Sequence, residues 1–419
     1  MHFSRFERYV AAALGCSLAL TLSSCRPKGT PPRPAVQYVR DILTDRSGAE
    51  YKAFSAYDPA SPDGPVCLVG ESVRCLRLSE VLMGCDLYDN VTGALAPDGL
   101  PDFAGESILS LFDEANTPYD GYLTASNTAY LRELAVRHVF ESLDTVTFIS
   151  NYDKEGMGRK KPAKMVLLLS PYMAAYGRFD ADTLFSCLGK PSPVFAPLDV
   201  MLDRVFGAAE GPVNVGVIAD STAIAAGVYE TVFEEKTKEF DATGSVCICG
   251  TAAASGGILT GFLDAYEAAG YTKPLSALLV DDPAVRTDSL LTELDRIRVE
   301  FSDESLRYGK MLSPGFRILD AGVVAAQECY RRLRESNTFT HNISYPTASA
   351  LVSYPLSDLP VTSYAADGSL APDFKFNRTP SSDVETYRLL QYGGRYVPAA
   401  VLQMLQDEAP KTYHSYVQN

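Results

Sequence analysis

Short apolar runs alternate with amphipathic stretches through the middle of this 419-residue chain. Each run is bounded by a polar or glycine-rich turn, and a stretch with helical spacing follows it. Because nearly every position in a run is apolar, the pattern is typical of strands that are buried on both faces, as in a parallel sheet covered by helices. The runs span residues 66–69, 146–150, 165–169, 213–218, 245–249 and 277–280.

Between the runs, apolar residues recur at the three- and four-residue spacing of one helix face. Leu290, Leu294 and Ile297 follow Asp288 and Ser289, which are typical N-cap residues. Strands that alternate with such helices predict an α/β fold.

The strand and helix pattern falls into two sets, separated by a small-residue stretch at 207–212. We therefore predict two doubly wound parallel-sheet lobes, a first lobe at 51–207 and a second at 208–340. Prolines divide residues 341–419 into short pieces, which predicts an irregular C-terminal segment that packs back on both lobes. A final helix is expected at about 398–408.

The N-terminus, residues 1–24, has the pattern of a secretory signal peptide. Arg5 and Arg8 precede an apolar run over 10–22, which is shorter than the about twenty residues of a membrane-spanning helix. The run ends in Leu22-Ser23-Ser24-Cys25, which resembles the lipobox of bacterial lipoproteins. This resemblance implies cleavage before Cys25 and lipidation of its thiol, with palmitate among the acyl chains. The alternative is an ordinary secretory signal with a chance cysteine.

Residues 25–50 begin with a proline-rich tract that predicts an extended tether. The membrane is thus an expected partner through the lipid on Cys25. Arg26, where some lipoproteins have Asp, favours the outer membrane over the inner one by resemblance to enterobacterial lipoproteins. The expected location is the cell envelope, facing the periplasm.

The charge of the chain bears on its partners. A formal net charge of −15, a pI of about 4.8 and the lack of a long Lys/Arg run argue against nucleic acid as a partner.

The glycine-rich turn at 250–257 lacks the spacing of dinucleotide and P-loop motifs, so no cofactor is expected. No second cysteine pair stands at zinc-ligand spacing, so no metal is expected.

Ligands of parallel sheets bind outside the carboxyl ends of the strands, where helix N-termini and turn amides converge. The residues that follow the predicted strands are small polar groups and carboxylates, which suit a polar solute such as a sugar, nucleoside or amino acid. The same residue types also cap helices, which is the alternative role for each of them. The candidate ligand-binding residues are Ser170, Tyr172, Asp220, Ser221, Thr222, Thr251, Ser255 and Asp281.

One histidine and four acidic residues are further catalytic candidates. His138 falls near the apolar stripe of its predicted helix, which favours a packing role over that of a base. The acidic positions Asp98, Asp102, Glu106 and Asp113 are interpreted as a solvated loop and helix face.

Two segments resemble the aspartate and glutamate racemases. They are residues 215–229, where a strand ends in a polar turn before a helix that carries Gly-x-Tyr, and Thr117-Pro118-Tyr119. The resemblance implies two lobes and two thiols, one on each side of the substrate carbon. The corresponding positions here are Ser170 and Cys249. The alternative function is therefore a racemase-like or isomerase-like enzyme that uses the single cysteine Cys249.

Two α/β lobes, a lipobox and a polar rim between the lobes also resemble the type I periplasmic binding proteins. This resemblance implies a tethered receptor that closes on a small polar solute, with a transporter as a possible partner. A receptor of this type does not require the second thiol that the racemases use and this chain lacks. The sequence therefore favours a receptor over an enzyme. A purely structural lipoprotein of the envelope is a third possibility.

Overall fold

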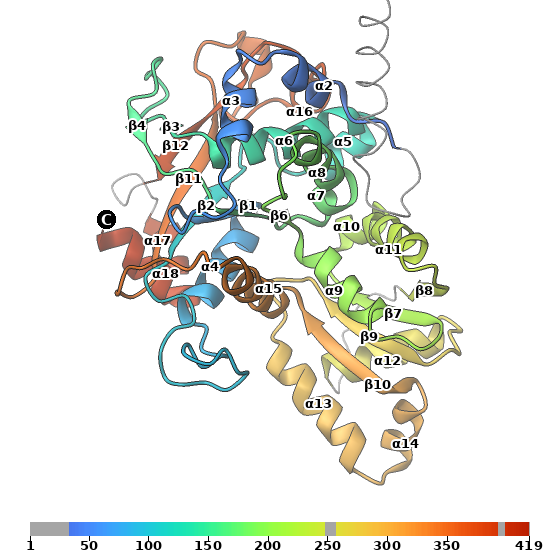
Figure 1. Ribbon diagram of the computed structural model, residues 1–419. Helices are drawn as coiled ribbons and strands as arrows, with labels where there is room; N and C mark the ends of the chain where they lie inside the picture. Colours follow the sequence, from blue (N-terminus) through green and yellow to red (C-terminus); the bar gives the residue numbers. More distant parts are fainter. Residues whose placement is uncertain (1–32, 248–256, 393–398, 419) are drawn as a thin grey trace, which may run out of the picture.

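The computed structural model describes residues 33–247, 257–392 and 399–418 (Figure 1). It contains two sheets, each covered by helices, and confirms the predicted two-lobe α/β fold. The first sheet has the strand order β12-β11-β2-β1-β5-β6, and all of its neighbours are parallel except β11 and β12. Its strands are β1 (Val66–Gly70), β2 (Ser107–Phe112), β5 (Met165–Leu168), β6 (Val194–Phe195), β11 (Thr347–Pro355) and β12 (Tyr387–Tyr392).

The second sheet has the order β10-β9-β7-β8 and is parallel throughout. Its faces follow from the two-residue period of a strand. Val215 and Val217 face the large core that continues into the first lobe, whereas Ile218 and Val280 face a smaller core under the helices that follow. Both faces are therefore buried, as the apolar runs predict. The strands are β7 (Val213–Ile218), β8 (Gly244–Cys247), β9 (Leu275–Val280) and β10 (Leu312–Asp320).

The strand pattern differs from the prediction in several places. The run at 146–150 forms no full strand of the two large sheets. Val146–Thr147 (β3) pairs with Gly158–Arg159 (β4) in a hairpin, and Phe148 makes a single bridge to Leu390 at the edge strand β12. Conversely, β2, β6 and β10 are absent from the predicted runs. The most central of them is β2, which lies beside β1 in the first sheet. Its apolar run is interrupted by Ser110, which is fully buried.

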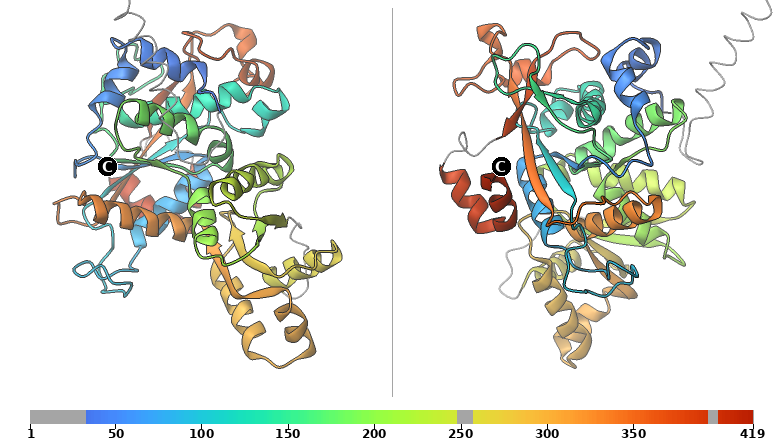
Figure 2. Two further views of the ribbon diagram at one scale, coloured as in Figure 1. Left: turned by 45° about the vertical axis from the view of Figure 1, so that its right-hand side comes forward. Right: turned by 60° about the vertical axis from the view of Figure 1, so that its left-hand side comes forward.

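Helices cover both faces of the first sheet (Figures 1 and 2). One face carries α4 (Ser72–Gly84), α15 (Ala321–Ser336), α17 (Ala399–Glu408) and α18 (Pro410–Gln418). The other face carries α2 (Gln37–Thr44), α3 (Ala49–Ala56), α5 (Asp120–Thr124), α6 (Thr128–Leu143), α7 (Pro171–Tyr176) and α8 (Arg178–Cys187). The helices of the second lobe are α10 (Ser221–Ala225), α11 (Val228–Glu239), α12 (Ile258–Ala268), α13 (Thr287–Val299) and α14 (Asp303–Gly309).

The chain crosses between the lobes twice. It leaves the first sheet through β6 and α9 (Pro197–Phe206), and it returns from β10 through α15, which packs on α4 and α9. The segment after residue 340 adds β11 and β12 to the first sheet, together with η1 (Val361–Ser363) and α16 (Pro372–Phe376). Of the helices in the described part of the chain, none has both the length and the apolar composition to cross a membrane.

Candidate functional site

The carboxyl ends of the two sheets meet at the guanidinium of Arg74, in the first turn of α4. Its Nη1 donates to Oδ1 of Asp281 at 2.7 Å, and its Nε lies 3.8 Å from Oε2 of Glu71. Glu71 follows β1 of the first lobe, and Asp281 follows β9 of the second. The hydroxyl of Tyr229 on α11 donates to the other Asp281 oxygen at 2.7 Å. Groups from both lobes therefore share one polar cluster, which we call the Arg74 cluster.

Burial changes the acidity of both carboxyls in the Arg74 cluster. Asp281 is 4% exposed, and its loss of water raises the pKa of its carboxyl although Arg74 opposes the shift. Burial likewise raises the pKa of Glu71, again against Arg74. Glu71 is the more accessible of the two, because its side chain is 30% exposed. Both carboxyls therefore hold a proton more readily than a carboxyl in water.

The remaining contacts of Glu71 leave one oxygen without a hydrogen bond. Oε1 accepts a hydrogen bond from the hydroxyl of Ser170 at 3.0 Å. Oε2 accepts no hydrogen bond from any described residue. Oε2 is itself buried, and the Arg74 Nε at 3.8 Å is the charged group beside it.

The predicted ligand-binding residues fall into three groups. Ser170, Tyr172, Thr222 and Asp281 lie at facing strand ends, and Tyr172 donates to Thr222 Oγ1 across the lobes at 3.4 Å. Asp220 caps α10, since its Oδ1 accepts from the Thr222 and Ala223 amides at 2.8 and 3.3 Å; Ser221 beside it is exposed. The last group, together with the predicted cysteines, lies outside the described residues: Thr251, Ser255, Cys249 and Cys25.

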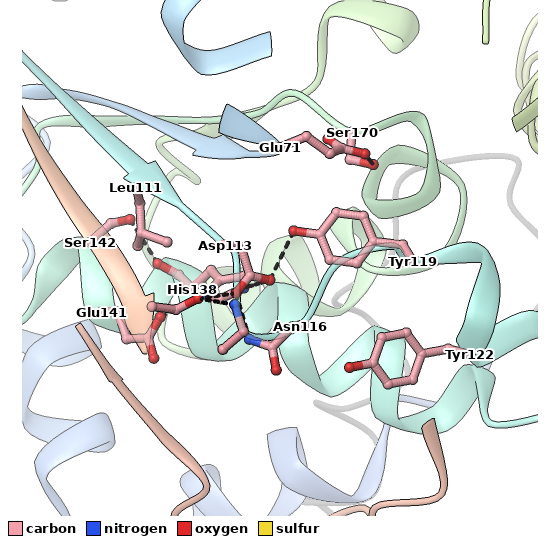
Figure 3. A network of polar contacts seen from close by, with 12 residues as sticks. Glu71, Leu111, Asp113, Asn116, Tyr119, Tyr122, His138, Glu141, Ser142 and Ser170 are labelled. Atoms are coloured by element: carbon pink, nitrogen blue, oxygen red, sulfur yellow. Dashed lines mark hydrogen bonds and ion pairs between the residues drawn. The ribbon is translucent and has the colours of Figure 1, made fainter. Parts of the chain in front are cut away.

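A second polar network lies under the first sheet's carboxyl edge, around the fully buried His138 (Figure 3). Its Nε2 lies 2.7 Å from Asp113 Oδ2, and its Nδ1 lies 2.6 Å from Glu141 Oε2. Burial alone lowers the pKa of this ring, but the two carboxylates outweigh it and raise the pKa to about 10. His138 is thus an imidazolium that donates from both nitrogens, and it holds elements together instead of acting as a base.

Asp113, which follows β2, collects donors from three parts of the chain. Besides His138 it accepts from Asn116 at 2.5 Å, from the Tyr119 hydroxyl at 2.9 Å and from Ser353 of β11 at 2.9 Å. The Tyr119 ring stands between Asp113 and the pair of Glu71 and Ser170 (Figure 3). The network therefore positions the wall of the Arg74 cluster.

The interpretation of the acidic stretch as solvated is correct for Asp98 and wrong for the other three positions. Asp102, Glu106 and Asp113 are all buried. Asp102 accepts the Leu87 and Tyr88 amides at 2.8 and 3.0 Å, and Glu106 forms an ion pair with Lys164 at 2.7 Å. One signal for Asp113 was present in the sequence, because it directly follows the apolar stretch of β2.

A cavity of 180 Å³ opens beside the Arg74 cluster, between α4 of the first lobe and the β9–α13 and β10–α15 turns of the second. Its charged lining comprises Arg74, Arg77, Asp281, Asp282, Arg286, Asp288 and Asp320. Within the described residues, no group of three or more His, Cys, Asp or Glu side chains is arranged to hold a metal ion.

The sequence matches no protein-family profile and no curated protein. Among solved structures it is similar to glutamate racemase isoform RacE1 from Bacillus anthracis, with 14% identity, a TM-score of 0.40, and 69% of this chain and 88% of that chain covered. It is also similar to glutamate racemase from Francisella tularensis in complex with D-glutamate, with 17% identity, a TM-score of 0.40, and 71% of this chain and 90% of that chain covered. A third similar structure is glutamate racemase from Aquifex pyrophilus, with 13% identity, a TM-score of 0.37, and 68% of this chain and 87% of that chain covered.

The prediction of a solute receptor of the periplasmic binding protein type is wrong, because the similar solved structures are glutamate racemases. In the structure Asp281 accepts from Arg74 and Tyr229, and the Ser170 hydroxyl donates to Glu71. The strand ends thus bond to one another across the lobes, and Arg74, Tyr229 and Glu71 are the members that the predicted site lacks.

Proposed function

We propose that this chain is an isomerase-like enzyme that moves a proton on a small carboxylate substrate at the Arg74 cluster. The observation that carries the proposal is the pairing of Glu71 and Asp281. They come from different lobes, burial raises the pKa of both, and a single guanidinium joins them.

Inversion at a carbon needs a base on one face and an acid on the opposite face. One of the two carboxylates takes the proton from carbon, and the other, protonated, gives its proton to the opposite face. The carbon loses and regains one proton, and the protein keeps the same number of protons overall. Raised carboxyl pKa values suit this exchange, because each group then holds and releases a proton nearer to neutral pH.

Arg74 defines the class of substrate. A guanidinium binds a carboxylate through two parallel hydrogen bonds, and it stabilises negative charge that develops next to that carboxylate. The proton that is removed would then be on the carbon adjacent to the carboxylate, as in an amino acid or a hydroxy acid.

The test is proton exchange in D₂O, followed by NMR, with both enantiomers of aspartate, glutamate, malate and lactate. We expect the α-proton signal of one compound to disappear with the natural chain. Glu71→Gln and Asp281→Asn should each slow this exchange at least about a hundredfold, since a positioned acid or base contributes on that scale. Glu114→Gln, an exposed neighbour of Asp113, is the matched control and should exchange at the natural rate.

Circular dichroism and thermal unfolding establish that each variant is folded. The proposal fails if no compound exchanges, or if the two variants exchange as fast as the control. The single-cysteine alternative makes the opposite prediction, since Cys249→Ser would then abolish exchange while Glu71→Gln would not.

We also propose that Cys25 carries a lipid that anchors the chain in the cell envelope, at the outer membrane facing the periplasm. The sequence motif supports this. The chain that follows the motif contacts both lobes from Arg33 on. Arg33 contacts Glu235 of the second lobe at 3.5 Å and the Ala175 carbonyl of the first at 3.3 Å. Arg132 donates to the Pro34 carbonyl at 2.7 Å. The predicted tether therefore does not extend to residue 50, because α2 and α3 begin at Gln37 and Ala49.

Cys25→Ala should leave an uncleaved precursor without palmitate label, because the thiol is the site of acylation. Cys16→Ala, inside the apolar run, is the matched control and should be processed and labelled normally. Labelling with radioactive palmitate and separation of the membranes by density measure both outcomes. Processing and membrane attachment of Cys25→Ala would exclude the anchor, and label in the inner membrane fraction alone would exclude the outer location.

A further inference from the structure

We propose that the cavity beside α4 binds a small oxyanion, a carboxylate or a phosphate, through Arg77 of the first lobe and Arg286 of the second. Both arginines line the cavity. Glu71, Ser170 and Tyr172 do not line it, so it shares only Arg74 and Asp281 with the Arg74 cluster. The inference does not depend on the proposed acid–base function, since it concerns binding at a separate position.

The two arginines differ from the third guanidinium in the cavity. Arg74 is held by Asp281 at 2.7 Å. Arg77 and Arg286, in contrast, have no side-chain hydrogen bond, ion pair or ring contact with any described residue, in a chain whose net charge is −15. A guanidinium presents a fork of donors that matches the oxygens of a carboxylate or a phosphate. Two such groups at one cavity therefore point to an anion.

Two of the carboxylates that line the same cavity accept hydrogen bonds from their own turns. Asp282 accepts the Ala284 amide at 2.9 Å. Asp320 accepts the Val323 amide at 2.9 Å and the hydroxyl of Thr287. Asp288 is exposed. In the described part of the chain they also form no metal-binding group, so the lining does not favour a cation.

The first turn of α13 adds a second attraction for an anion. This helix of 13 residues begins at Thr287, which lines the cavity, and no side chain caps its first amides. Amides at a helix N-terminus bind anions, because they lack partners within the helix and lie at the positive end of its dipole. An anion at this position would contact Arg286 and the α13 amides of one lobe and Arg77 of the other.

Such an anion would also affect the Arg74 cluster. It would lie next to Arg74 and compete with Asp281 for that guanidinium, and it would link the two lobes. A bound oxyanion is thus expected to favour one relative position of the lobes over others.

The test is calorimetric titration of the purified chain with inorganic phosphate and, separately, with succinate, at constant ionic strength set with sodium chloride. We expect saturable binding of at least one of them with one site per chain. Arg77→Gln and Arg286→Gln should each weaken it at least about tenfold, since each removes a charge-assisted pair of hydrogen bonds. Arg296→Gln lies on the same helix outside the cavity and should bind as tightly as the natural chain.

The two probes distinguish the source of the anion. Binding of phosphate alone indicates a phosphorylated ligand, and binding of succinate alone indicates a carboxylate. Arg77→Lys keeps the positive charge and should retain part of the affinity, which separates loss of the site from loss of folding. Absence of saturable binding of either probe, or equal weakening by Arg296→Gln, would overturn the proposal.

Discussion

Replacement of Asp113 by Ala is expected to lower the free energy of unfolding by about 3–5 kcal/mol, the usual effect of removing one partner of a buried ion pair. The loss removes one of the two carboxylates that His138 contacts, and three further donors lose their acceptor. These are Asn116, Tyr119 and Ser353, so the first sheet, α6 and the C-terminal strand β11 lose a common contact.

The effect of Asp113→Ala depends on pH. The pKa of His138 is raised from 6.5 to about 10, so its contribution is complete below pH 6.5 and is lost as pH rises through about 10. Burial raises the pKa of Asp113, but His138 and the other donors outweigh it and lower the pKa below 3.8. The contribution of Asp113 is therefore complete above pH 3.8 and is lost in stronger acid. The difference between natural chain and variant should be largest between pH 3.8 and 6.5.

Denaturant unfolding of both proteins across this pH range measures the difference. Glu114→Ala is the matched control, because Glu114 is the next residue, is exposed and should change the free energy of unfolding by less than about 0.5 kcal/mol. Equal stability of Asp113→Ala and Glu114→Ala would show that the network contributes nothing to folding.

Lys164→Met should also lower the free energy of unfolding by about 3–5 kcal/mol, because it leaves the Glu106 carboxylate buried without a cation. The two side chains are 2% and 1% exposed and lie 2.7 Å apart. The ammonium of Lys164 donates in addition to the carbonyls of Pro62 and Thr338, at 3.1 and 2.8 Å. Three segments of the first lobe therefore depend on one side chain.

Lys161 lies in the same loop as Lys164 and forms an exposed ion pair with Asp63, so it offers the matched control. Its side chains are 68% and 76% exposed, so Lys161→Met should change the free energy of unfolding by no more than about 1 kcal/mol. Glu106→Gln in the background of Lys164→Met should restore part of the loss, since it removes the unpaired charge and keeps an acceptor for the Thr340 amide. An unchanged midpoint of urea unfolding for Lys164→Met would contradict this account.

The architecture of the lobes could be predicted because its signal is local. The runs at 213–218 and 277–280 are apolar at nearly every position, and such runs are stable only where helices cover both faces of a sheet. The same argument predicts that polar groups gather at the carboxyl ends of the strands. In the structure Ser170, Thr222 and Asp281 each contact a polar group from a neighbouring turn or helix.

The partners within that region depend on the tertiary structure alone. Arg74 and Asp281 are 207 residues apart, and nothing near either residue indicates the other. Asp113 illustrates the same limit, since an aspartate after a strand has the same local sequence whether it is solvated or bound to a buried histidine. A buried charge is stabilised by opposite charges and donors that the order of strands brings beside it. The sequence by itself therefore determined two parallel sheets and their polar edge, whereas the packing of the lobes decided which of these charges are paired and which remain open to a ligand.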